Sequence, residues 1–74
     1  MEGYTLIMTE SRIIISGLSI LLRENGIGVR VKSDTIPGYD LSFDVDELFI
    51  DDKDLIRATG LVNNYKKRIN RPSL

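Results

Sequence analysis

Residues 21–32 read LLRENGIGVRVK and place the end of a helix directly before a strand. Asn25 and Gly26 end the helix, because glycine readily adopts the left-handed conformation that closes a helix C-terminus. In the strand that follows, apolar residues alternate with polar or small ones. The apolar set is Ile27, Val29 and Val31, and the other set is Gly28, Arg30 and Lys32. This alternation predicts one buried face and one solvent-exposed face.

The residues before this stretch predict a strand followed by a helix. Tyr4–Thr9 is short, apolar and partly β-branched, which is typical of a strand. The helix is expected to begin at Glu10 or Ser11, and its apolar residues recur with the helical period. They are Ile14, Leu18, Leu21 and Leu22, with Ile13 and Ile15 widening the face. Gly17 is expected to allow a close approach of the helix to the sheet.

The residues after this stretch predict a loop and a third strand. The loop is Ser33–Gly38, in which Pro37 and Gly38 suit the central positions of a type II turn. The apolar residues of the strand are Leu41, Phe43 and Val45, followed by Leu48 and Ile50. The last two have the opposite parity, and a shift of one residue turns every side chain to the other face. We therefore predict a β-bulge or a short turn near Asp46 and Glu47.

A second helix follows, capped by Asp51 or Asp52. Asp51 and Asp54 have the spacing of a capping box, and acidic side chains suit the positive end of the helix dipole. The apolar face of this helix consists of Leu55, Ala58, Val62, Tyr65 and Ile69. The last turn carries Lys66, Lys67 and Arg68, where positive charge is favoured.

The order β-α-β-β-α predicts an α+β fold in a single domain, residues 1–74. The ordered core is expected to cover about residues 4–69, with 70–74 as a tail. Two helices on one face of an antiparallel sheet match a ferredoxin-like plan that lacks its last strand. In that plan the third strand lies between the first two, and the first strand keeps an open edge.

The open edge makes self-association the expected source of extra stability. A chain of 74 residues buries only about 60 % of its unfolded surface. The chain has no cysteine and no histidine, which excludes disulfides and the commonest zinc ligands. A partner subunit is the remaining source, so we expect a homodimer. The expected self-association edge is Tyr4, Thr5, Leu6, Ile7 and Met8.

The composition favours neither catalysis nor a membrane span. Without histidine the serine side chains lack their usual general base, and nothing resembles a phosphate loop, so no enzyme activity and no cofactor are expected. The longest apolar stretch, Ile13–Leu22, is shorter than the ~20 residues that span a bilayer. No targeting segment is visible, which makes a cytoplasmic location the expectation. The net charge of −1 does not favour nucleic acid as a partner.

Charged residues cluster at two places. The acidic residues between positions 34 and 54 lack the spacing of a calcium loop, and we interpret them as a solvated strand edge and a helix N-terminus. The basic end suits the helix dipole, and it also offers contacts to an anion, to a partner, or weakly to nucleic acid or a membrane surface. Its residues are Lys66, Lys67, Arg68 and Arg71.

The 33–40 loop is a second candidate contact surface. Its residues of interest are Asp34, Ile36, Pro37, Gly38 and Tyr39. Ile36 and Tyr39 either close over the sheet as core, which we favour, or form a patch for a partner or ligand. A small-ligand sensor would hold its ligand between this loop and the helix starts at Glu10 and Asp52.

Two motifs resemble a known family. The first is a helix end and strand start at Leu21–Ile27, and the second is a strand end, acidic turn and helix start at Ile50–Ala58. With Thr9 closing the first strand, about residues 4–66 resemble the small bacterial domains of the DUF2007 family, described as prokaryotic signal transducing proteins. The resemblance implies a ferredoxin-like fold related to the GlnB-like nitrogen regulators, and it supplies no catalytic residues.

The function expected from residues and resemblance together is a non-catalytic regulatory or protein-interaction module that self-associates and transduces a signal. This chain lacks the long loop and the basic site with which GlnB-like proteins bind nucleotide. We therefore expect neither ATP nor 2-oxoglutarate to bind. The small-ligand sensor and the weak nucleic-acid or membrane-surface binder are the alternatives.

Overall fold

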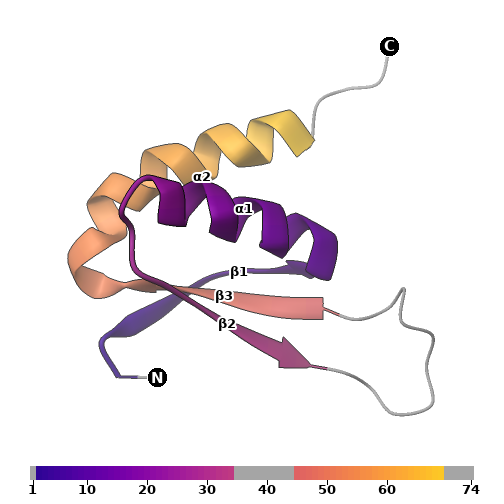
Figure 1. The fold of residues 1–74 in the computed structure, drawn as a ribbon, viewed down its shortest axis with the longest axis horizontal. Helices are drawn as coiled ribbons and strands as arrows, with labels where there is room; N and C mark the ends of the chain where they lie inside the picture. Colours follow the sequence, from indigo (N-terminus) through magenta and orange to yellow (C-terminus); the bar gives the residue numbers. More distant parts are fainter. Residues whose placement is uncertain (1, 35–44, 70–74) are drawn as a thin grey trace.

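The computed structural model describes residues 2–34 and 45–69. In chain order the elements are β1 (Tyr4–Ser11), α1 (Arg12–Glu24), β2 (Val29–Asp34), β3 (Val45–Asp51), the short 3-10 helix η2 (Asp52–Asp54) and α2 (Leu55–Ile69). The three strands form an antiparallel sheet in the order β1-β3-β2. Both α-helices lie on the same face of this sheet (Figure 1). The predicted α+β class, with three antiparallel strands and two helices, is confirmed.

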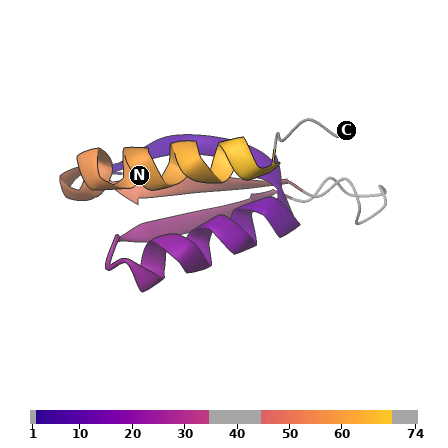
Figure 2. The same cartoon turned by 90° about the horizontal axis from the view of Figure 1, so that it is seen from above.

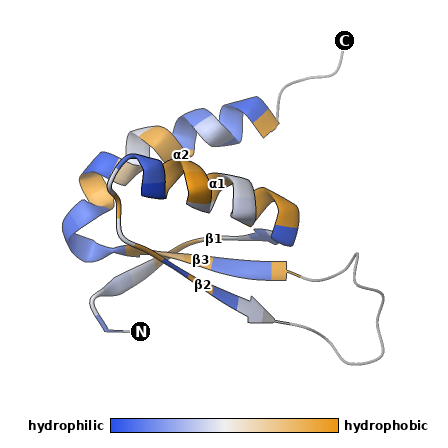
Figure 3. Ribbon diagram, viewed as in Figure 1, coloured by the Kyte–Doolittle hydropathy of each residue, from blue (hydrophilic) through white to orange (hydrophobic). Residues whose placement is uncertain are grey.

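The helices lie side by side above the sheet, with α2 toward β1 and α1 toward β2 (Figure 2). The core fills the layer between helices and sheet. Its buried apolar residues are Met8, Ile15, Leu18, Leu22, Ile27, Leu48, Ile50, Ala58 and Val62. Figure 3 shows hydrophobic segments where the elements meet and a mostly hydrophilic C-terminal half of α2. No helix among the described residues is long and apolar enough to cross a membrane.

The predicted end of α1 is confirmed. Gly26 has a φ of 75°, the left-handed conformation that glycine adopts without strain. The Gly26 amide donates to the Arg23 carbonyl and the Ile27 amide to the Leu22 carbonyl, both at 3.0 Å. This pair of hydrogen bonds closes the helix and leads the chain at once into β2.

The buried face of α1 differs from the prediction. Ile15 is fully buried, whereas Ile13 is 85 % exposed and does not widen the apolar face. Residues two apart on a helix point about 200° from each other, so the core can take only one of them. The fully buried positions follow the phase of Ile15, and Ile14 is only half-buried.

The space at Gly17 is limited by α2. The prediction that Gly17 allows a close approach of α1 to the sheet is therefore wrong. A Cβ at Gly17 would come within 2.5 Å of the Tyr65 hydroxyl oxygen on α2. That hydroxyl donates to the Ile14 carbonyl at 3.2 Å. Gly17 therefore lets α2 pack closely enough for its tyrosine to reach the backbone of α1.

The predicted bulge near Asp46 and Glu47 is also wrong. β3 alternates without interruption, so that Asp46 points toward the helices like Leu48 and Ile50. Asp46 is buried and accepts a hydrogen bond from the Arg12 guanidinium, Nε to Oδ1 3.2 Å. The break in register lies in β1, between Leu6 and Met8. The predicted strand residues Leu41 and Phe43 lie outside the described residues.

The start of α2 is capped, but not by a capping box. Asp51 accepts a hydrogen bond from the Lys53 amide at 3.1 Å and caps η2, which leads into α2. Asp54 instead accepts from the amide of Gly28, the residue just before β2, at 2.9 Å. The predicted apolar face of α2 is confirmed from Leu55 to Tyr65, but Ile69 is exposed.

Candidate interaction site

The edge of the sheet at β1 is open among the described strands. β1 pairs with β3 on one side, and no other described strand pairs with it. Residues 4–9 contain no charged side chain and no proline. Natural edge strands are commonly protected by lysine, proline or short length. An eight-residue edge whose first six residues, 4–9, carry neither charge nor proline therefore resembles a pairing site more than a protected edge.

The five residues predicted for this edge have different surroundings. Thr5 and Leu6 are exposed, Tyr4 and Ile7 are half-buried, and Met8 belongs to the core. The register break places Leu6 opposite Phe49 and Met8 opposite Leu48, so Ile7 is the extra residue of a bulge. Bulges re-aim side chains, and here Ile7 faces α2.

A groove of about 190 Å³ lies between β1 and α2. Its lining residues are Ile7, Leu55, Ala58, Thr59, Val62, Asn63 and Lys66. Ala58 and Val62 are buried members of the core and form the floor. Thr59, Asn63 and Lys66 are exposed and form the rim. The groove thus combines an apolar floor with an adjacent unpaired strand edge.

Side-chain bonds hold α2 at both ends and so hold the wall of the groove in place. At its start, Asp54 accepts from the Gly28 amide, and Arg57 donates to the Asn25 carbonyl at 2.7 Å. Gly28 also lets the neighbouring Asp51 pack closely, because a Cβ at position 28 would lie 3.1 Å from the Asp51 Cβ. At its end, the Tyr65 hydroxyl reaches α1. A wall fixed by tertiary bonds needs little ordering when a ligand binds.

The basic residues on α2 divide into two surroundings. Lys66, Lys67 and Arg68 are all exposed in the last turn. Lys66 lines the groove, whereas Lys67 and Arg68 are not among its lining residues. Arg71, the fourth predicted contact, lies outside the described residues. Of these three side chains, Lys66 is therefore the one that an extended ligand paired with β1 would contact.

The acidic residues are less solvated than predicted. Asp46 and Asp54 are 4 % and 6 % exposed, and each has a hydrogen-bonding partner. Asp54 also lies 3.7 Å from the Arg57 guanidinium. Within the described part of the chain no group of three or more acidic side chains is placed to hold a metal ion. These two carboxylates stabilise the fold.

The structure does not bring together the helix starts proposed for a small ligand. Glu10 lies opposite Asp46 in the sheet, near the end of β1. The Asp52 amide donates to the Gly3 carbonyl just before β1 begins, so the two helix starts lie at opposite ends of this strand. Asp34 is the last residue of β2. The other loop residues considered for this site, Ile36, Pro37, Gly38 and Tyr39, lie outside the described residues.

The α2 side of the groove was not recognised from the sequence as a binding surface. Leu55, Ala58 and Val62 were predicted only as core, and no role was predicted for the rim residues Thr59 and Asn63. The sequence does contain a signal for this surface, because an amphipathic helix packed beside an open strand has more apolar surface than that edge can cover.

No protein-family model, curated protein or solved structure matches this chain.

Proposed function

We propose that this domain is a non-catalytic regulatory or protein-interaction module that binds its partner by strand addition. An extended segment of the partner pairs with the free edge of β1 and places alternate side chains in the groove beneath α2. Main-chain hydrogen bonds supply affinity in this mode of recognition, and the pockets for alternate side chains supply specificity. The observation that carries the proposal is the groove of about 190 Å³ beside the unpaired edge.

We further propose a ferredoxin-like fold for this chain. The strand order β1-β3-β2 and the placement of both helices on one face support this assignment. In the ferredoxin-like plan a fourth strand lies beside β1, which is the position where the groove is found. The groove thus has the location of a strand site. The resemblance to the DUF2007 family supports a signal-transducing role for the bound state.

The available side chains support binding more than chemistry. The chain contains no histidine and no cysteine. The groove itself offers one cation, Lys66, and two neutral polar groups on Thr59 and Asn63. Such a lining recognises an extended peptide with apolar residues at alternate positions and an acidic residue near Lys66.

Filling the groove should weaken binding. Peptides of about ten residues, selected from a displayed library against the full chain, serve as probes that cover one strand. We expect Asn63→Trp to weaken their binding by at least about tenfold, because the indole occupies the groove. The measurement is the dissociation constant by titration calorimetry, together with hydrogen exchange of the β1 amides, which should slow when peptide is bound.

Asn64→Trp is the matched control, because Asn64 is the exposed neighbour of Asn63 on α2 but is not among the groove-lining residues. Peptide affinity should be unchanged in this variant. Selected peptides that bind both variants equally, or that leave exchange in β1 unaltered, would show that the groove is not the binding site. A library that yields no binder would also count against the proposal.

A further inference from the structure

We infer that the strand that occupies the groove is β1 of a second copy of this chain, paired antiparallel about a twofold axis. This inference rests on the proposed function, because it assigns a partner to the same edge and groove. The pairing makes one sheet continuous across the two copies. It is isologous: each copy offers the same edge and the same groove to the other.

Hydrogen bonds near both ends of α2 show its direction relative to β1. The Asp52 amide, just before α2, donates to the Gly3 carbonyl, just before β1, at 2.9 Å. Near the other end of α2, the Tyr65 hydroxyl reaches Ile14, which closely follows β1. α2 therefore runs alongside β1 in the same direction. In an antiparallel pair, the start of the second copy's β1 lies beside the last turn of α2.

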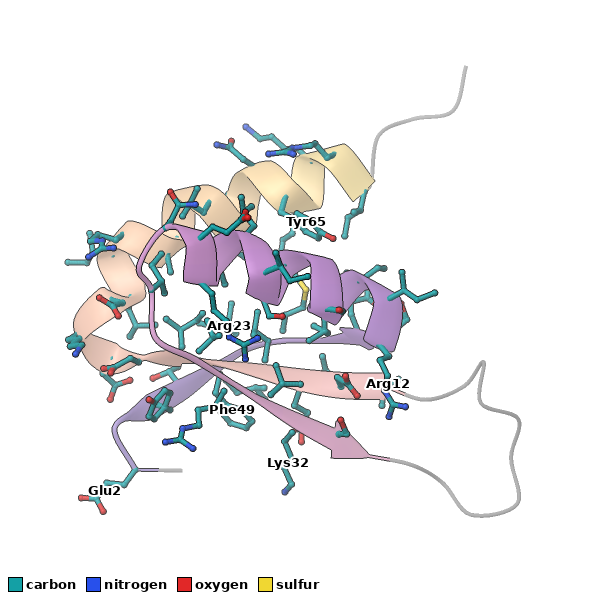
Figure 4. The ribbon with its side chains drawn as sticks, viewed as in Figure 1. Glu2, Arg12, Arg23, Lys32, Phe49 and Tyr65 are labelled. Atoms are coloured by element: carbon teal, nitrogen blue, oxygen red, sulfur yellow. The ribbon has the colours of Figure 1, made fainter. Side chains whose placement is uncertain are left out.

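The charges at these two places are opposite. Glu2 is exposed and lies two residues before the start of β1 (Figure 4). The last turn of α2 carries Lys66, Lys67 and Arg68, and Lys66 stands at the groove. The twofold axis therefore brings Glu2 of each copy to the basic turn of the other, twice per dimer. A parallel arrangement would instead place Glu2 beside the acidic η2.

The middle of the interface is apolar and self-complementary. Residues 4–9 carry no charge, so two copies of β1 can approach without desolvating an ion. Ile7 of each copy lies at the mouth of its own groove. Pairing covers this side chain and satisfies the unpaired backbone groups of both edges. A domain of 74 residues has a small core, so this added burial is a substantial gain.

The uncovered face of the sheet is the competing surface for a second copy. Phe49 and Lys32 project from this face, away from the helices (Figure 4). Leu6, the cross-strand neighbour of Phe49, is 46 % exposed. Arg30 lies on the same face, 5.4 Å from the centre of the Tyr4 ring. On the same face Lys32 lies opposite Glu47, so opposite charges already lie side by side within one copy, unlike Glu2 and the basic turn.

A charge exchange tests the inference on the full chain. Sedimentation equilibrium should show a dimer for the natural sequence. Glu2→Lys and Lys66→Glu should each raise the dimer dissociation constant by about tenfold, since each change turns two attractions into two repulsions. The double variant should restore the natural value to within about threefold. Lys67→Glu, which makes the same charge change outside the groove lining, should have a much smaller effect than Lys66→Glu.

Hydrogen exchange then locates the interface. Exchange of the β1 amides should slow as the concentration of the natural chain rises, while exchange in β2 should stay constant. A dimer that keeps fast exchange in β1, or one whose double variant is weaker than either single variant, would place the contact elsewhere, and the uncovered sheet face is then the candidate.

A chain that is monomeric at every concentration overturns the inference, and the peptide experiment separates this result from failure of the proposed function. A monomer that binds selected peptides, and loses them in Asn63→Trp, keeps the strand-addition site and assigns it to a different protein. A monomer that binds no peptide removes both.

Discussion

Ile15→Ala is expected to lower the free energy of unfolding by about 3 kcal/mol. Ile15 is fully buried in the core between α1 and the sheet, so truncation removes its apolar contacts and leaves a cavity. The total stability of a domain of this size is about 4–11 kcal/mol, and the change is therefore a large fraction of it. Urea unfolding followed by circular dichroism measures the effect, at one protein concentration for all variants because association shifts apparent stability.

Ile13→Ala is the matched control on the same helix. Ile13 is 85 % exposed, and its truncation removes few contacts. We expect a change within about 0.5 kcal/mol, because alanine also has the higher helix propensity. Equal losses for the two variants would contradict the assigned phase of α1.

Asp54→Ala is expected to cost about 2 kcal/mol, because a buried carboxylate that accepts a backbone hydrogen bond is lost. Asp54 is 6 % exposed and accepts from the Gly28 amide at 2.9 Å. Removing it leaves that amide without its acceptor and removes the ion pair with Arg57, which lies 3.7 Å from the carboxylate. The start of α2 would then be held less firmly, and peptide binding in the groove should weaken as well.

Asp54→Asn separates the hydrogen bond from the charge. The amide oxygen of asparagine can still accept from Gly28, so we expect the loss to be about 1 kcal/mol or less. Thermal unfolding of the three proteins at one concentration gives the comparison. If Asn were as destabilising as Ala, the ion pair with Arg57 would be the dominant interaction and the bond to Gly28 secondary.

Local sequence signals were sufficient for the elements and their order. The glycine after Asn25 and the alternation that follows it fixed the boundary between α1 and β2, and both are properties of neighbouring residues. The apolar period of residues 55–65 likewise indicated the buried side of α2. Such signals depend on backbone conformation and on spacing along one element, so the sequence contains them directly.

The phase of α1 shows where local signals fail. Three consecutive isoleucines, residues 13–15, are compatible with more than one buried face. The choice is made by α2, because Tyr65 packs over Gly17 and bonds to the Ile14 carbonyl. This contact joins residues 51 positions apart and leaves no trace in the period of either helix.

The parity of β3 was misinterpreted for a related reason. The apolar residues before Asp46 and those after Glu47 have opposite parity in the sequence, and a bulge was therefore predicted between them. Asp46 keeps the regular alternation because Arg12, 34 positions away, supplies its partner. The bulge lies in β1 instead, where Ile7 fits against α2. The residue types of β1 do not indicate it.

The sequence alone determined the elements, their order and the uncharged character of residues 4–9, because each is set by residues close together in the chain. Only the tertiary structure decided that α2 lies alongside β1 and that a groove opens between them. The width of the groove is the distance between β1 and α2. The position of α2 is set by the hydrogen bonds between Asp54 and Gly28 and between Tyr65 and Ile14. Such distances depend on pairs of residues that are remote in sequence, and spacing along the chain does not encode them.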